Sequence, residues 1–441
     1  MRSAYVREKA KDQTMWKAIA GLAAIALGGA VGVVAGQLDQ QAFKGSLDHP
    51  AIQYATRPLR DPVARLSREM ADGRIQLPFE ARSGFLRGVL RALDVPVESQ
   101  IVTFSKTSLQ SPRITPENPR TLFFNDSVAV AWVNGGFIEL AATDPEQGVN
   151  FYTLQFDRQI QPRFVHQTVC LSCHESFTSF DVPGLLVKSV FASRDGSAMY
   201  RFGSYIPDHR TPFAERWGGW YVTGDSSALR HMGNAIVADE STRRQAGNNE
   251  TPDVQTIRMQ LDTTAYLSPY SDVAALMVFN HQTRMTNLLI RVGWEFRVAG
   301  YGRSGVLETT GPLREMVNEL VDYLLFVDEA VLPARVRGTS GFAEKFSAAG
   351  PRDRNGRSLR QLDLGRRLLQ YPCSYMIYAE AFDGLPPEAR AAIYARMWQV
   401  LSGGDPSPRY ARLSRSDRQA IVEILRDTKK GLPDYFQPEV R

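Results

Sequence analysis

Short runs of alternating or clustered apolar residues fill the stretch from Ile101 to about Gln161. Runs of this length, separated by turn residues, are typical of strands in a half-buried sheet. Asn134-Gly135-Gly136 stands between two of them and predicts a hairpin turn. We therefore expect strands at Thr121–Phe124, Val128–Val133, Phe137–Ala142 and Asn150–Phe156.

Helical patterns lie on both sides of this β-rich stretch. Residues 37–100 are expected to be mostly helical, for example at Asp61–Glu69 and Phe79–Leu93. From about Gly311 onward apolar residues recur at helical spacing, and Pro386-Pro387-Glu388 has the composition of a helix N-terminus. The helices expected there are Leu313–Phe326, Pro386–Leu401 and Ser416–Arg426.

Residues 162–300 are rich in Gly, Pro and aromatic side chains and have few long periodic runs. Five of the six histidines of the chain lie there. The polar run Arg243–Asp253 is expected to be an exposed loop. These patterns divide the chain into four segments: 1–36, 37–161, 162–300 and 301–441.

An uncharged run, Ala18–Gly36, follows five basic side chains near the start of the chain. At about 1.5 Å per residue it is just long enough to cross a ~30 Å hydrocarbon layer. It is expected to be a cleaved signal peptide or a retained transmembrane anchor, and its length favours the anchor. The positive-inside rule then predicts an inner membrane-anchored or periplasmic protein, with the bulk of the chain on the periplasmic side.

The charge balance argues against a nucleic-acid partner. The chain of 441 residues has 52 basic and 47 acidic side chains, a net charge of +5. Residues 1–17 hold five of the basic side chains and two of the acidic ones, so the remainder is close to neutral. A nucleic-acid-binding domain needs a basic patch, and none is evident.

Three cysteines are too few for a disulfide-stabilised scaffold.

One motif indicates chemistry: Cys170-Leu171-Ser172-Cys173-His174, a C-x-x-C-H sequence. Cysteines three positions apart lie on one side of a helical turn, so both sulfurs can form thioethers with one porphyrin. His174 follows them and can be the proximal iron ligand. The motif therefore predicts one covalent haem c, bound through Cys170 and Cys173, in a protein that binds iron through its haem.

Two other interpretations of the motif are weaker. A zinc site needs about four protein ligands, and no second C-x-x-C pair occurs. A thioredoxin-type dithiol belongs to a βαβ unit, which the flanking residues 164–169 do not continue. The third cysteine, Cys373, is expected to be a small buried core residue.

The sequence resembles a group of bacterial single-haem cytochrome c domain-containing proteins whose function is uncharacterised. The resemblance covers most of the chain after residue 100 and includes the haem segment through Val182-Pro183-Gly184. It implies a covalent haem c and export, because haem c is attached on the outer side of the bacterial membrane, but it implies no substrate. The other similar segments are 104–110, Phe124-Asn125-Asp126, 208–212, 216–224, 231–234, 275–277, His281-Gln282 and 371–375.

The ligand opposite the proximal histidine decides between a closed electron carrier and an open haem enzyme. His231 and Met232 are the preferred candidates. They lie in a loop with Gly and Asn beside it, and their separation from His174 is common for the distal methionine loop of small cytochromes c. The alternative is a packed loop histidine beside a buried methionine. Three other side chains compete for this role: Met199, His209 and His281.

The aromatic and glycine-rich block Glu215–Tyr221 allows two interpretations. Its tryptophans can line the porphyrin while nearby arginines pair with haem propionates, because a guanidinium suits a carboxylate. Alternatively, Gly218-Gly219 is a tight turn between bulky core residues. The candidate haem-binding residues of this region are Arg210, Arg216, Trp217 and Trp220.

Together these features predict a multi-domain α+β protein, mainly helical, with a β-rich N-terminal part and a small α-helical cytochrome c-like haem region. Its expected function is that of an exported monohaem c-type cytochrome exchanging electrons with redox partner proteins in the membrane or periplasm. The alternatives are a peroxidase-like haem enzyme with an open distal iron site and a subunit of a redox complex. No catalytic residue is predicted, since no known hydrolase or phosphate-binding motif occurs.

Overall fold

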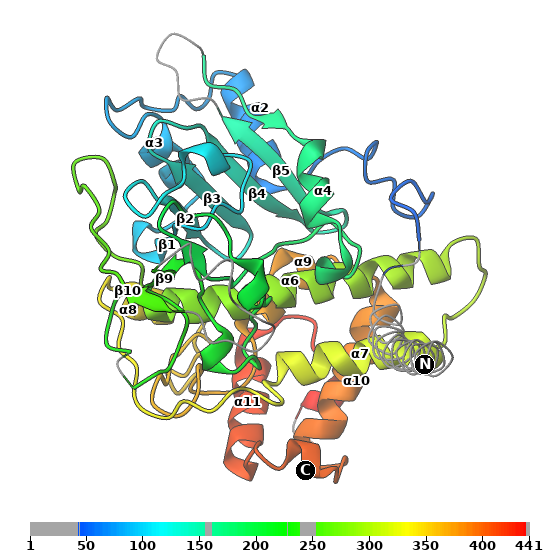
Figure 1. Cartoon of the computed structure of the whole chain (residues 1–441). Coiled ribbons are helices and arrows are strands. Elements are labelled where there is room, and N and C mark those ends of the chain that lie inside the picture. Colours follow the sequence, from blue (N-terminus) through cyan, green and yellow to red (C-terminus); the bar gives the residue numbers. More distant parts are fainter. Residues whose placement is uncertain (1–42, 44, 155–160, 227, 239–252, 438–441) are drawn as a thin grey trace, which may run out of the picture. The chain divides into compact units, whose positions relative to one another are not determined.

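A computed structural model of the chain describes residues 43, 45–154, 161–226, 228–238 and 253–437 (Figure 1). The chain divides into two compact units, residues 1–44 and 45–441, and the fold described below is that of the second unit. The predicted loop at Arg243–Asp253 lies, apart from its last residue, outside the described residues.

The main sheet has seven strands, all paired antiparallel, in the order β6-β5-β4-β3-β2-β1-β8. The four strands predicted from the sequence are confirmed as β2 to β5, and Gly135, with φ of +77°, lies in the turn between β3 and β4. The strand bounds are β1 Ile101–Thr103, β2 Arg120–Phe124, β3 Val128–Val133, β4 Ile138–Asp144, β5 Gly148–Leu154, β6 Val165–His166 and β8 Trp220–Tyr221. A smaller sheet contains β7 Ala192–Ser193, β9 Ala235–Val237 and β10 Val254–Thr256.

Helices precede and follow the main sheet in the chain. The predicted helices of the C-terminal part are confirmed as α7, α10 and α11, whereas only the second half of the predicted Phe79–Leu93 helix is helical, as α3. The helix bounds are α2 Pro62–Ala71, α3 Leu86–Ala92, α4 Leu171–His174, α6 Val273–Gly300, α7 Gly311–Leu324, α8 Phe342–Ala348, α9 Glu380–Asp383, α10 Pro387–Leu401 and α11 Arg415–Thr428.

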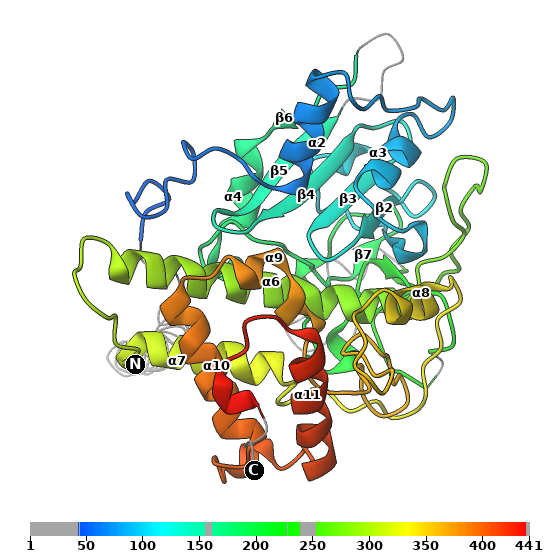
Figure 2. The same ribbon diagram turned by 180° about the vertical axis from the view of Figure 1, so that it is seen from behind.

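The long helix α6 lies between the main sheet and the C-terminal helices, as both views show (Figures 1 and 2). One apolar core fills the space between α2, α3 and one face of the sheet. A larger core joins the other face of the sheet to α6 and the C-terminal helices. Of the 28 residues of α6, 22 are buried, so this helix is enclosed on nearly all sides.

Two buried aspartates link the helices to the rest of the fold. Asp61 caps α2 by accepting from the backbone N–H groups of Val63 and Ala64, and its other oxygen accepts from Tyr152 on β5 at 2.6 Å. Asp272 caps α6 in the same way and also accepts from the backbone N–H of Thr339 at 2.7 Å. Each carboxylate therefore satisfies backbone donors that the helix cannot pair itself.

The structure therefore has a mixed α and β composition, with the sheet in the N-terminal half and most helices after it. This confirms the coarse fold class predicted from the sequence. The small α-helical cytochrome c-like region does not stand out. Residues 161–238 contain, where described, only short helices and short strands.

The prediction of a transmembrane helix requires correction. Among the helices that the structure describes, none is long and apolar enough to cross a membrane. The run Ala18–Gly36, on which the prediction rested, lies outside the described residues.

Candidate haem-attachment site

The C-x-x-C-H motif forms one compact turn at the edge of the main sheet. The 3-10 helix Thr168–Cys170 runs directly into α4, just after strand β6 (Figure 1). Cys170 is partly buried and Cys173 is exposed, and both thiols are free. The backbone thus places the two sulfurs within one helical turn, as the sequence spacing predicts.

His174 is held by Gly184, which follows it in the chain. Its Nδ1 atom lies 3.0 Å from the carbonyl oxygen of Gly184, and the Gly184 N–H donates back to the carbonyl of His174 at 2.9 Å. Because a carbonyl can only accept, Nδ1 carries the proton and Nε2 keeps a lone pair. Burial lowers the pKa of His174, which also favours the neutral ring.

Gly184 is itself fixed against helix α6. Asn287 of that helix accepts from the Leu185 N–H and donates to the Leu185 carbonyl, both at 2.8 Å. A Cβ atom on Gly184 would lie only 2.5 Å from Asn287 Oδ1, so the approach requires glycine. Helix α6 therefore supports the carbonyl group that orients His174.

The cysteine environment does not favour the thioredoxin-type interpretation. Burial, and next the nearby Glu139 carboxylate, raise the pKa of Cys170 to about 11. A reactive dithiol needs the opposite shift, because the thiolate is the nucleophile.

A bare metal site is not found either. Within the described ranges no group of three or more His, Cys, Asp or Glu side chains is placed to hold a metal ion. The prediction of metal binding is corrected to this extent: the chain offers no site of that kind among these residues. A haem iron takes only one or two protein ligands, so this finding does not bear on a haem.

Apolar side chains are exposed around the motif. Val165, Val169 and Phe177 have exposed fractions of 41%, 54% and 60%. All three lie within five residues of the motif in the chain, and large apolar groups more often lie in the core. A porphyrin has apolar faces, so the residues around the motif fit a haem that would cover them.

The other predicted haem-binding residues have partners within the protein. Arg216 is buried and donates to the backbone carbonyls of Thr211 and His209, at 2.7 and 2.9 Å. Arg210 forms an ion pair with Asp208 at 3.0 Å. Trp217 and Trp220 are buried, and their indole N–H groups donate to Asn280 Oδ1 and the Lys188 carbonyl.

His231 and Met232 are also held by other groups. The Met232 sulfur is buried and lies 3.7 Å from Ser189 Oγ, whereas the His231 ring packs against Trp217 at 5.2 Å. His174 instead contacts Phe151, with ring centroids 4.6 Å apart. Among the described residues, no hydrogen bond or ring contact joins His174 to either candidate.

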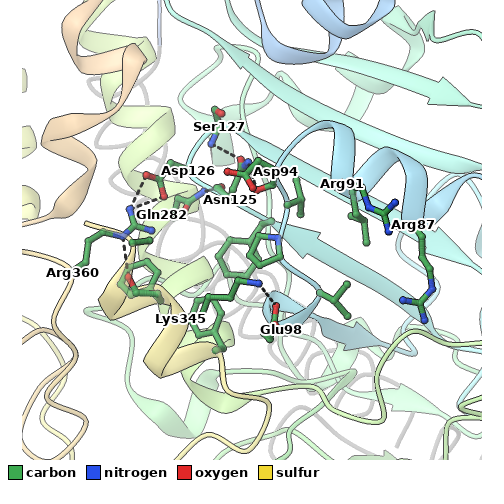
Figure 3. A pocket seen from close by; sticks show the side chains of 18 residues that line it. Arg87, Arg91, Asp94, Glu98, Asn125, Asp126, Ser127, Gln282, Lys345 and Arg360 are labelled. Atoms are coloured by element: carbon green, nitrogen blue, oxygen red, sulfur yellow. Dashed lines mark hydrogen bonds and ion pairs between the residues drawn. The ribbon is translucent and has the colours of Figure 1, made fainter. Parts of the chain in front are cut away.

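A pocket of about 580 Å³ lies elsewhere, between α3, the β2–β3 turn, α6 and α8 (Figure 3). Two ion pairs line it, Arg360 with Asp126 at 2.7 Å and Lys345 with Glu98 at 2.9 Å. None of the residues predicted for the haem site is among its lining residues. The pocket is therefore separate from the C-x-x-C-H motif.

Comparison of the chain with protein-family models, with curated proteins and with solved structures finds no match.

Proposed function

We propose that the chain is an exported monohaem c-type cytochrome that exchanges electrons with redox partner proteins. Cys170 and Cys173 would hold the haem covalently, and His174 would be the proximal ligand. When bound, the haem supplies the reversible one-electron chemistry of its iron. Residues 162–300 would then form the haem c-binding domain of the protein.

The hydrogen bond from His174 Nδ1 to the Gly184 carbonyl, 3.0 Å long, carries this proposal. Metal-binding histidines commonly donate their second ring N–H to a carbonyl, which fixes the tautomer and the orientation of the ring. Here the bond leaves Nε2 with its lone pair, in the neutral form that binds a metal. The exposed position of Cys173 supports an electron carrier as well, because a partner must approach the cofactor closely.

Haem staining of a denaturing gel tests the proposal. The wild-type chain, expressed with the c-type maturation machinery, should retain haem after denaturation. The Cys170→Ala, Cys173→Ala double variant should lose the stain, because both thioether positions are removed. Cys373→Ala is the matched control and should keep it, since Cys373 is fully buried away from the motif. A wild-type chain that matures without covalent haem would refute the proposal.

One observation supports a second candidate, a haem enzyme with an open distal position. His231 packs on Trp217, and Met232 lies against Ser189, so neither is directed to His174 by a contact in this structure. An iron without a second protein ligand can bind a small molecule. Carbon monoxide binding by the ferrous protein separates the two candidates, because only an open iron site binds it.

A further inference from the structure

A largely buried ion pair crosses the main sheet beside the haem-attachment motif. Arg120 on β2 and Glu139 on β4 lie 2.8 Å apart, with exposed side-chain fractions of only 18% and 14%. The strand between them, β3, pairs Ala131 with Glu139 and Val133 with Arg120. Residues paired directly across strands share a face, so both charged groups lie on the same side of the sheet.

This face of the sheet is the one that carries the motif. In the pairing of β4 with β5, Glu139 lies opposite Thr153 and Ala141 lies opposite Phe151. Glu139 therefore shares its face with Phe151, whose ring contacts His174 at 4.6 Å. Thr153 accepts a hydrogen bond at 2.9 Å from Gln167, which shortly precedes Cys170. The ion pair thus approaches the motif from the sheet.

The pair brings one positive and one negative charge to the face of the sheet that it shares with Phe151, and the Phe151 ring contacts His174. Arg120 also has a buried Nε–H group with no hydrogen-bond partner in the described part of the chain. Charges that are shielded from water act over longer distances than exposed ones, because screening is weak there.

We propose, on the basis of the haem function proposed above, that Arg120 and Glu139 set the reduction potential of the haem, with opposite effects. Ferric haem carries one more positive charge than ferrous haem. Its reduction adds one electron to the iron and neither forms nor breaks a bond. A nearby cation disfavours the ferric state and raises the potential. A nearby carboxylate stabilises the ferric state and lowers it. Both are positioning residues that act through charge, without contacting the iron.

Potentiometric titration of the purified haem-loaded full chain tests this inference. Arg120→Gln should lower the midpoint potential by about 59 mV, which is a tenfold change in the reduction equilibrium of a one-electron couple. Glu139→Gln should raise it by a similar amount. The Arg120→Gln, Glu139→Gln double variant should return close to the wild-type value, and Arg120→Lys should stay close to it.

The matched control is Arg367→Gln. Arg367 pairs with Asp417 at 2.7 Å and has the same exposed fraction as Arg120, 18%, but its partner lies on α11, apart from α4 in both views (Figures 1 and 2). Arg367→Gln should leave the midpoint potential unchanged. If Arg120→Gln does not fold, the opposite shift in Glu139→Gln carries the test.

Three negative results have different meanings. Equal potentials in haem-loaded wild type, Arg120→Gln and Glu139→Gln would overturn this inference and leave the haem function standing. Shifts of the same sign in both variants would also overturn it, because they would indicate structural damage in place of a charge effect. A wild-type chain without covalent haem would overturn the proposed function and this inference with it.

Discussion

His209 and His281 are two fully buried imidazoles whose Nδ1 atoms lie 2.8 Å apart. A hydrogen bond between these two nitrogens needs one proton between them, so one Nδ1 donates and the other accepts. His281 Nε2 also pairs with Ser374 Oγ at 2.7 Å, and both rings stack on Phe326. Burial lowers the pKa of His281 to about 3 and that of His209 well below its ordinary value.

This pair should make the protein less stable in mild acid. Below pH 6.5 the unfolded chain binds protons at both histidines, whereas the folded chain does not bind one at His281 until the pH approaches 3. His281 alone should therefore cost about 2 kcal/mol of unfolding free energy between pH 7 and pH 5, and His209 should add a loss of the same sign. Urea unfolding of wild type at the two pH values should show this loss of stability in acid.

His281→Gln tests the assignment of this loss. The variant should be less stable at pH 7, because it disturbs a buried network, but its loss of unfolding free energy between pH 7 and pH 5 should be smaller than that of wild type by about 2 kcal/mol. An unchanged pH dependence in His281→Gln would contradict the account.

At the level of single residues, the C-x-x-C-H motif can be recognised from the sequence because all of its groups are close neighbours in the chain, and its role in haem attachment stays a prediction. The other residues around the motif could not be predicted in the same way. Gly184 lies well after His174, and Arg120 and Glu139 belong to strands that come much earlier in the chain. Only the folding of these strands against one another places their charges beside His174. Val182-Pro183-Gly184 was noted as part of a resemblance, without a role.

Among the secondary-structure elements, α6 shows where pattern analysis is insufficient. The strands β2 to β5 were predicted from short apolar runs between turn residues, and the helices α7, α10 and α11 from apolar residues at helical spacing. Around His281 the sequence indicates only a short helical stretch, with Met277 and Met285 one turn away. The full length of α6 is not marked, because the helix is buried on nearly all sides and its polar residues, such as Asn280 and Asn287, are buried too, so no polar face shows its period.

Helix α6 should support the motif through Asn287. In Asn287→Ala the N–H and carbonyl groups of Leu185 would lose their partners at a buried position. Leaving two buried backbone groups unpaired should cost roughly 2–4 kcal/mol of unfolding free energy, measured by urea denaturation. Because Gly184 orients His174, the haem-loaded variant should also show an altered absorption spectrum.

Thr286→Val is the control on the same helix. Thr286 is buried beside Asn287, but its hydroxyl has no hydrogen-bond partner within the described structure. Its replacement by an isosteric side chain should leave stability unchanged within about 1 kcal/mol, or raise it slightly. Equal losses of unfolding free energy in Asn287→Ala and Thr286→Val would show that any change of a polar residue on α6 destabilises the protein. The proposed role of Asn287 would then be wrong.

At the scale of the whole molecule, the chain is much larger than one haem requires. The sheet supplies Phe151 and the Arg120–Glu139 pair, and α6 supplies Asn287, so parts distant in sequence meet at the motif. This arrangement explains part of the size of the chain. A helix of one turn such as α4 is not stable by itself, so other parts of the fold are needed to hold the His174 side chain in place. The C-terminal helices enclose α6 from its other side.

The electron-carrier proposal predicts a second protein ligand on the iron, so the ferrous wild-type protein should not bind carbon monoxide. The ligand is expected from the pair His231 and Met232. Met232 is buried and would have to leave its packed position and its 3.7 Å contact with Ser189 to reach an iron. His231→Ala and Met232→Ala, measured separately by absorption spectroscopy, should reveal the ligand, because the variant that removes it should bind carbon monoxide.

Met199→Ala serves as the control and should behave like wild type, because the proposal assigns the ligand to the pair His231 and Met232. Carbon monoxide binding by the wild-type protein would contradict the closed iron site and favour the haem enzyme. If neither variant of the pair binds carbon monoxide while the wild type resists it, the carrier proposal stands and the choice of ligand is wrong. His281 would then be tested next, although a ligand from that position would have to leave its bonds to both His209 and Ser374.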